Sequence, residues 1–160
     1  LVEVPGNKGL TAAQRQERVD TVYAPFCGTV SEVIKTRKDA GLQTLLVTMH
    51  SFTPVYYGKP RAVEIGILHD DDSRLADAML AAAPALPHRR VERNEPYGPA
   101  DGVTHSLKIH GLAHGLANVM IEIRNDLVTT PEEEEALAEE MLTLLRPALA
   151  ALAAEGGFDA

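Results

Sequence analysis

The sequence predicts an α/β fold with a mixed, largely parallel sheet. Three short runs rich in strand-forming residues carry this prediction, at residues 43–49 (QTLLVTM), 62–68 (AVEIGIL) and 117–124 (ANVMIEIR). The first run is mostly apolar, as expected for a strand that is buried on both faces. Segments with the helical spacing of apolar residues separate the runs. Strands that alternate with helices in this way are typical of layered α/β proteins.

The first helix is predicted to begin after Thr11 and to end at Gly41. Thr11 is a favourable N-cap residue, and Gln14 stands at the capping-box position three residues later. Pro25 is expected to kink this helix. Apolar residues recur every three or four positions and predict a buried stripe made of Val19, Val22, Phe26, Val30, Val33 and Ile34.

Two further helices are predicted in the second half of the chain. One spans residues 74–83 and is ended by prolines. The other begins at Thr130, which is followed by proline at the first helical position and by Glu133 as the capping-box partner. Its expected buried stripe comprises Leu137, Met141, Leu144, Leu145, Ala148 and Leu152. Residues 104–116 fit either a helix or a loop.

Length and composition exclude several classes of protein. The 160 residues have the size of one domain, and 45% of them are hydrophobic, which is usual for a globular protein. A net charge of −8 argues against a nucleic-acid partner, and no apolar run is long enough to cross a membrane. The single cysteine, Cys27, cannot form an internal disulfide and is expected in the core. We therefore expect a cytoplasmic protein with no nucleic-acid and no membrane partner.

Residues of catalytic type lie at the ends of two predicted strands. His50 follows the first strand, and neutral imidazole is a favoured zinc ligand, but a histidine held by hydrogen bonds is an equally good interpretation. Glu122 lies between two isoleucines in an apolar strand, so its carboxylate needs a partner or a function. It is either half of a structural ion pair, for example with Arg124, or a general base beside a metal-bound water.

His110 and His114 are spaced like two ligands on one helical face. The glutamate of the usual zinc-protease motif is absent there, and Gly111 and Gly115 weaken a helix, so a two-histidine metal site is not the favoured interpretation. Surface roles are expected for His69 and His88, which lie in polar turns.

Four separated motifs resemble one known family. They are PGNKGL at residues 5–10, HSFTPVYYGKPR at 50–61, NEPYGPADGVTHSLKIHG at 94–111 and IEIRNDL at 121–127. Together and in this order they resemble the N-formylglutamate amidohydrolase family over nearly the whole chain. The resemblance implies a three-layer α/β/α fold like that of the zinc carboxypeptidases and aspartoacylases (phosphorylase/hydrolase-like).

The resemblance also implies an activity and a set of site residues. The activity is zinc-dependent hydrolysis of an N-acylated amino acid, N-formyl-L-glutamate giving formate and L-glutamate. His50 matches a zinc ligand, and Glu122 matches the glutamate that activates the metal-bound water. Arg124 is expected to orient Glu122 or to meet a substrate carboxylate. The resemblance places Asn94, Tyr97 and His110 in the substrate pocket.

One departure from the family pattern concerns the remaining zinc ligands. A Cys-Glu-His-Ala-Gly-like motif that should supply them would lie upstream of residue 1. Because a catalytic zinc usually has three protein ligands, we expect residues 1–160 to be a single domain that forms the C-terminal part of a larger amidohydrolase domain and lacks its N-terminal strands. An exposed sheet edge favours association, so we also expect a homo-oligomer.

Two alternatives to this function stay open. One is a related zinc amidase or peptidase that acts on another acyl-amino acid or on a peptidoglycan-type amide, because a family resemblance constrains chemistry better than substrate. The other is a catalytically inactive module that binds a carboxylate ligand or a partner. In each case a small-molecule ligand with an acyl-amino-acid character is the expected partner.

Overall fold

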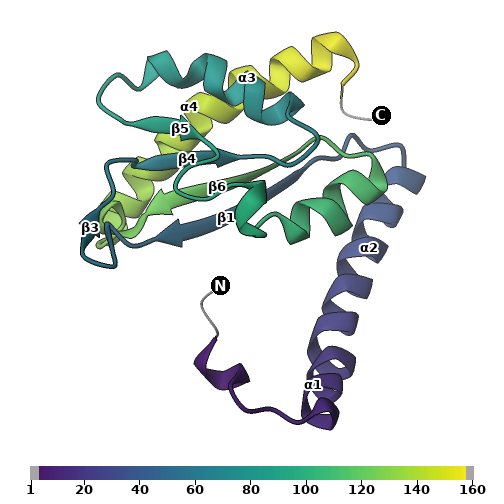
Figure 1. Cartoon of the computed structure of the whole chain (residues 1–160). Helices are drawn as coiled ribbons and strands as arrows, with labels where there is room; N and C mark the ends of the chain where they lie inside the picture. Colours follow the sequence, from purple (N-terminus) through teal and green to yellow (C-terminus); the bar gives the residue numbers. More distant parts are fainter. Residues whose placement is uncertain (1–3, 158–160) are drawn as a thin grey trace. The chain divides into compact units, whose positions relative to one another are not determined.

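A computed structural model describes residues 4–157 (Figure 1). The chain forms two compact units, Leu1–Gln43 and Thr44–Ala160. The first unit is helical and the second contains the sheet, so each is described by itself. The prediction of a single domain over residues 1–160 stays a prediction.

The first unit is one helical path whose winding changes along its length. It contains α1 (Ala12–Arg18), a π-helical turn (Val19–Tyr23) and α2 (Ala24–Asp39). The predicted capping box is confirmed, because the Thr11 hydroxyl accepts from the Gln14 amide and the Gln14 side chain accepts from the Thr11 amide. Pro25 follows the π-helical turn and stands in the first turn of α2, where its missing N–H costs little.

The predicted buried stripe of this unit is confirmed at Ile34 and is wrong for most of its other residues. Val22 is 66% exposed and Phe26 is 59% exposed, whereas Ile34 is the only buried residue of α2. Cys27 is half-buried and does not lie in a core. The physical reason is that one continuous helical path offers no second layer of its own against which an apolar stripe can pack.

The second unit is built on a four-stranded sheet with the order β1-β6-β4-β5 (Figure 1). The strands are β1 (Leu46–Phe52), β6 (Asn118–Arg124), β4 (Ile65–Leu68) and β5 (Val91–Arg93). Two of the three pairings are parallel and the β4–β6 pairing is antiparallel, which confirms the mixed, mostly parallel sheet. The sequence did not predict β5 or the small hairpin of β2 (Val55–Tyr56) and β3 (Lys59–Pro60).

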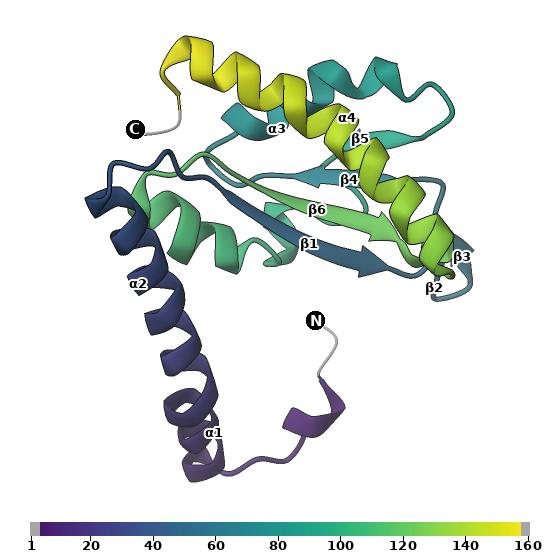
Figure 2. The same ribbon diagram turned by 180° about the vertical axis from the view of Figure 1, so that it is seen from behind.

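Two helices cover one face of the sheet, α3 (Arg74–Ala82) and α4 (Pro131–Glu155), as both views show (Figures 1 and 2). The odd-numbered residues of the strands point to this face and form the main core with the helices; they include Ile65, Ile67, Val119, Ile121 and Ile123. Helix α4 begins with the predicted capping box and buries the predicted stripe, apart from Leu145, which is half-buried. Burial of this apolar area is the main source of stability.

Residues 104–116, which fitted either a helix or a loop, are mostly helical. This helical segment covers the opposite face of the sheet (Figure 2). This segment contains a π-helical turn (Leu107–Gly111) and a 3-10 turn (Leu112–His114). Leu107 packs there against Leu68 and Met120, which are even-numbered strand residues. Gly111 lies directly on the Asn118 side chain, because a Cβ atom at Gly111 would be 2.6 Å from Asn118 Cγ. The close contact explains why glycine suits this position.

Asp70 ties the end of β4 to this helical segment. Its side chain is 4% exposed, accepts a hydrogen bond from the Thr104 hydroxyl, and lies 3.4 Å from the Lys108 ammonium. Burial by itself raises the pKa of Asp70, but the contacts with Thr104 and Lys108 outweigh it and lower the pKa below the ordinary 3.8. A lowered pKa means that this stabilisation is complete above the unfolded pKa and is lost as the pH falls through the folded one.

We expect Asp70→Asn to lower the free energy of unfolding at pH 7 by about 1–3 kcal/mol, because it weakens hydrogen bonds to a buried charge. Denaturant unfolding between pH 3 and pH 7 measures this. The wild type should lose stability below about pH 4 more steeply than the variant. The neighbouring Asp71→Asn is the control, because Asp71 is exposed. Equal pH profiles for wild type and Asp70→Asn would contradict the assignment.

Candidate active site

His50 and Glu122 lie side by side on the sheet face opposite α3 and α4. Strands β1 and β6 are parallel and in register, so His50 pairs with Glu122, and on its other side Glu122 pairs with Gly66 of β4. The even-numbered residues of these strands share one face, which is also the face of Leu68 and Met120. His50 is exposed on the edge strand, and within residues 4–157 no side chain makes a hydrogen bond to its ring. The predicted pair is therefore brought together by strand register.

The Glu122 side chain is buried although it carries a carboxyl group. The residue is 6% exposed, and its Oε2 atom has no hydrogen-bond partner among the residues that the structure describes. Burial raises the pKa of Glu122, while the positive charges of His50 and Arg61 act in the opposite direction. The ion pair with Arg124, one of the two interpretations from sequence, is not formed within the described part of the chain. An unpaired buried carboxyl group is costly, which is typical of a functional site.

Arg61 also belongs to this face of the sheet, and it was not among the residues predicted from the sequence. Its guanidinium carbon lies 5.5 Å from the ring centre of Phe52, 4.3 Å from that of Tyr56 and 4.9 Å from that of Tyr97. The β2–β3 hairpin returns the chain to the end of β1, where the Arg61 amide donates to the Pro54 carbonyl at 2.8 Å. We call Arg61 and its three rings the arginine cage.

A tight turn between β2 and β3 precedes Arg61 in the chain. Tyr57 and Gly58 connect β2 to β3 with φ angles of 46° and 74°. Two successive positive φ angles are typical of the tight turns that match the twist of a β-hairpin. The only sequence signal for Arg61 was its place at the end of the motif HSFTPVYYGKPR, eleven residues after His50.

The loop after β5 crosses the sheet beside Glu122 and brings Tyr97 to the arginine cage. The Glu95 carbonyl lies against Gly66, where an added Cβ atom would be only 1.8 Å from that oxygen. Tyr97 packs against Leu68 and its neighbours, and its phenol oxygen accepts a hydrogen bond of 2.8 Å from Arg61 Nη2. Tyr97 thus contacts Arg61, and its predicted place in the substrate pocket stays a prediction.

Asn94 has a different environment from Tyr97, although the two residues are close in sequence. Its side-chain Oδ1 atom accepts a hydrogen bond from the backbone amide of His69 at 2.9 Å, and its backbone amide donates to the Ile67 carbonyl. Both contacts lie at the carboxyl ends of β4 and β5, which run opposite to β6. Its predicted role in substrate binding stays a prediction, and its side-chain oxygen is engaged by the His69 amide.

Arg124 fastens the chain segment that leads from Arg61 into β4. Its Nη1 atom donates to the Arg61 carbonyl at 3.2 Å, and its Nε atom donates to Asp126 at 2.7 Å. It also lies 3.7 Å from a Glu64 carboxylate oxygen. Most of the guanidinium is therefore engaged within the protein, and its predicted contacts with Glu122 or a substrate carboxylate stay predictions.

His110 is buried in the helical segment on the same side of the sheet. It is 3% exposed, and burial, together with the charges of His114 and His105, lowers its pKa. Within residues 4–157 there is no group of three or more His, Cys, Asp or Glu residues that could hold a metal ion. The substrate-pocket role predicted for His110 is not tested by this arrangement.

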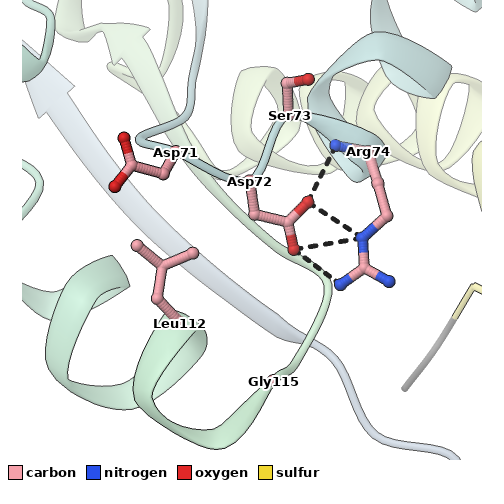
Figure 3. A pocket seen from close by; sticks show the side chains of 6 residues that line it. All are labelled: Asp71, Asp72, Ser73, Arg74, Leu112 and Gly115. Atoms are coloured by element: carbon pink, nitrogen blue, oxygen red, sulfur yellow. Dashed lines mark hydrogen bonds and ion pairs between the residues drawn. The ribbon is translucent and has the colours of Figure 1, made fainter. Parts of the chain in front are cut away.

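A separate open pocket of about 560 Å³ lies at the carboxyl end of β4 (Figure 3). It is lined by Asp71, Asp72, Ser73, Arg74, Leu112 and Gly115. Its one guanidinium, that of Arg74, already pairs with Asp72 at 2.7 Å, as the dashed lines in Figure 3 show. This pairing leaves the pocket without an obvious role in the chemistry of Glu122.

Comparison with known proteins identifies the family. The model of the N-formylglutamate amidohydrolase family matches residues 3–129, which is most of the chain. The chain belongs to this family. No curated protein sequence matches it significantly.

Two solved structures resemble this N-formylglutamate amidohydrolase family member. A gene product of Agrobacterium tumefaciens is 53% identical with a TM-score of 0.89, over 95% of this chain and 60% of that one. The N-formylglutamate amidohydrolase of Ralstonia eutropha JMP134 is 21% identical with a TM-score of 0.62, over 90% of this chain and 56% of that one. The second likeness shows the fold alone. The chain thus spans about 60% of the length of the first structure and less of the second.

The motifs that resemble the N-formylglutamate amidohydrolase family meet on one face of the sheet. The motif at residues 50–61 supplies His50 and Arg61, the motif at 94–111 supplies Tyr97, and the motif at 121–127 supplies Glu122. Segments far apart in sequence are therefore joined at one place by strand register and by the arginine cage. None of the described helices is both long and apolar enough to cross a membrane.

The residues present fit part of a zinc site. His50 offers an exposed imidazole, and the orphaned Oε2 of Glu122 lies on the neighbouring strand, as expected for a carboxylate that handles a proton beside a metal. The described residues supply one such ligand and no cluster of three, so they do not form a complete catalytic zinc site by themselves.

Proposed function

We propose that the protein hydrolyses the amide bond of an N-acylated amino acid, with N-formyl-L-glutamate giving formate and L-glutamate. Membership of the family supports the reaction, and the observation that carries the proposal is the buried Glu122 carboxyl group beside His50, with its unpartnered Oε2. Because the chain spans only part of its structural relatives, this activity is proposed for the protein in its full encoded length.

We also propose a zinc ion held in part by His50, with its other ligands outside residues 4–157. When bound, zinc polarises a substrate carbonyl and lowers the pKa of water. The exposed edge strand β1, on which Met49 is 54% exposed, supports the related proposal that further strands complete a zinc-carboxypeptidase-like sheet on that side.

Glu122 has the environment that a general base and acid needs. Its burial raises its pKa towards the range in which a carboxyl group both takes and gives a proton efficiently. We propose that it accepts the proton of the attacking water and passes it to the leaving amine nitrogen, so that the free amino acid departs. Arg61 keeps the carboxylate form of Glu122 accessible by attracting its charge.

The zinc proposal predicts the effect of His50→Ala. In the protein in its full encoded length, this change should lower the zinc content at least tenfold after dialysis, because removal of one direct ligand costs more than the 10- to 100-fold loss of affinity that is typical of a second-shell change. Formate release should fall in parallel. Zinc is measured by elemental analysis, and formate by a coupled assay.

The matched control for this experiment is His88→Ala, an exposed histidine that pairs with Glu140 at 3.0 Å. It should keep the zinc content and the activity of the wild type. Full zinc occupancy and full activity in His50→Ala would overturn the assignment of His50 as a ligand.

A further inference from the structure

The arginine cage contains a half-buried guanidinium that the protein does not neutralise. Five arginines of the second unit form ion pairs with carboxylates, namely Arg74, Arg89, Arg90, Arg93 and Arg124. Arg61 has no carboxylate within ion-pair distance among the described residues, although the whole chain carries a net charge of −8. An acidic protein that leaves this cation without a carboxylate partner keeps it available for a ligand.

We propose that Arg61 binds a carboxylate of the substrate and so selects acyl-amino acids with an acidic group. The proposal rests on the amide hydrolysis proposed above, to which it adds the residue that recognises the substrate. A planar guanidinium binds a carboxylate through two parallel hydrogen bonds, which gives both energy and orientation.

The cage fixes the orientation of this guanidinium before any ligand arrives. Tyr97 accepts from Nη2 at 2.8 Å, and the Thr53 carbonyl accepts from Nη1 at 3.4 Å. The rings of Phe52, Tyr56 and Tyr97 lie around the guanidinium and hold it by cation–π contacts. These neutral acceptors use only part of the five N–H donors of an arginine, so donors remain for a carboxylate.

The location of Arg61 suits a residue that binds the substrate next to the reacting groups. The Phe52 ring of the cage belongs to β1 and stands two residues after His50, so it lies on the sheet face that carries His50 and Glu122. The other arginine of this region, Arg124, is engaged by Asp126 and by three main-chain carbonyls. Arg61 is therefore the better carboxylate ligand of the two.

The test compares three substrates in the protein in its full encoded length. N-formyl-L-glutamate carries two carboxylates, N-formyl-L-glutamine has an amide in place of the side-chain carboxylate, and N-formyl-L-isoglutamine has an amide in place of the α-carboxylate. Arg61→Gln should lower kcat/KM about 10- to 100-fold, mostly through KM, on substrates that keep the anchored carboxylate. The substrate without that carboxylate should be nearly unaffected, which shows whether the α- or the side-chain group is bound.

Two further variants separate recognition from a structural role. Arg61→Lys keeps the charge without the planar fork and should lose less, with the same substrate pattern. Tyr97→Phe keeps the ring and removes only the oxygen that orients Arg61, so it should give a smaller loss on the same substrates. The exposed Arg146→Gln is the control and should match the wild type.

A binding measurement makes this inference independent of hydrolysis. Calorimetric titration with L-glutamate should show binding that weakens about 10- to 100-fold in Arg61→Gln. If Arg61→Gln loses L-glutamate binding and the wild type hydrolyses none of the three substrates, the result would contradict the proposed function and support Arg61 as the carboxylate ligand. Hydrolysis with an equal loss on all three substrates, unchanged L-glutamate binding in Arg61→Gln, or no L-glutamate binding to the wild type would each overturn the anchor.

Discussion

Glu122→Gln is expected to lower the rate of amide hydrolysis about 10²- to 10⁴-fold, which is the usual contribution of a general acid and base. The amide has nearly the same shape as the carboxyl group but cannot take up a proton from water. The loss should appear in kcat rather than KM, because Glu122 is proposed to act on the reacting proton and not on substrate binding. Steady-state kinetics with N-formyl-L-glutamate measure both constants.

The same substitution should not destabilise the protein. Burial raises the pKa of Glu122, so the folded state disfavours its charged form, and a neutral side chain removes this cost. The thermal unfolding midpoint of Glu122→Gln should therefore equal or exceed that of the wild type at pH 7. A purely structural carboxylate would give the opposite result.

Glu92 offers a matched control for Glu122→Gln, because both glutamates pair with Gly66 of β4. Glu92 pairs with Gly66 on the other side of β4 and is ion-paired with Arg90. Glu92→Gln should leave kcat within about threefold, since surface ion pairs contribute little. Wild-type activity in Glu122→Gln would rule out Glu122 as the general base.

Among substitutions that add one methyl group to the second unit, Gly66→Ala is expected to destabilise the fold most. The added Cβ atom would lie 1.8 Å from the Glu95 carbonyl oxygen, and both atoms belong to the backbone or are bonded directly to it, so no side-chain rotation relieves the clash. The free energy of unfolding should fall by about 3 kcal/mol, the upper end of the usual cost of overpacking. Denaturant unfolding monitored by circular dichroism measures the loss.

The damage should extend to the site, because the displaced loop carries Tyr97, which orients Arg61. The control is Gly98→Ala in the same loop, where an added Cβ atom would have ordinary contacts of 3.4 Å and φ is −145°. It should change the free energy of unfolding by less than about 0.5 kcal/mol, as is usual away from tight packing. Similar losses in both variants would contradict the close approach at Gly66.

Local patterns predicted those elements that depend on nearby residues. The Thr130 capping box and the apolar spacing of α4 depend on positions three or four apart, and both are confirmed. The apolar neighbours of Glu122 were enough to predict its burial. Strand β1 begins and ends three residues later than predicted and includes His50, because its pairing with β6 runs from Leu46 to Phe52.

Features that depend on long-range pairing could not be predicted in the same way. Strand β5 is a three-residue run in polar surroundings, and it is a strand only because it pairs with β4. The antiparallel direction of β4 against β6 separates Asn94 from Arg124, and no local pattern encodes that direction. Arg61 joins the site through a hairpin and three rings, so its role became visible only with the fold.

The account is tested most directly by formate release from N-formyl-L-glutamate in the unsubstituted protein of full encoded length. It predicts saturable production of formate and L-glutamate in equal amounts, abolished by a chelator and restored by added zinc. No formate above the uncatalysed rate, in protein shown to be folded and loaded with zinc, would contradict it.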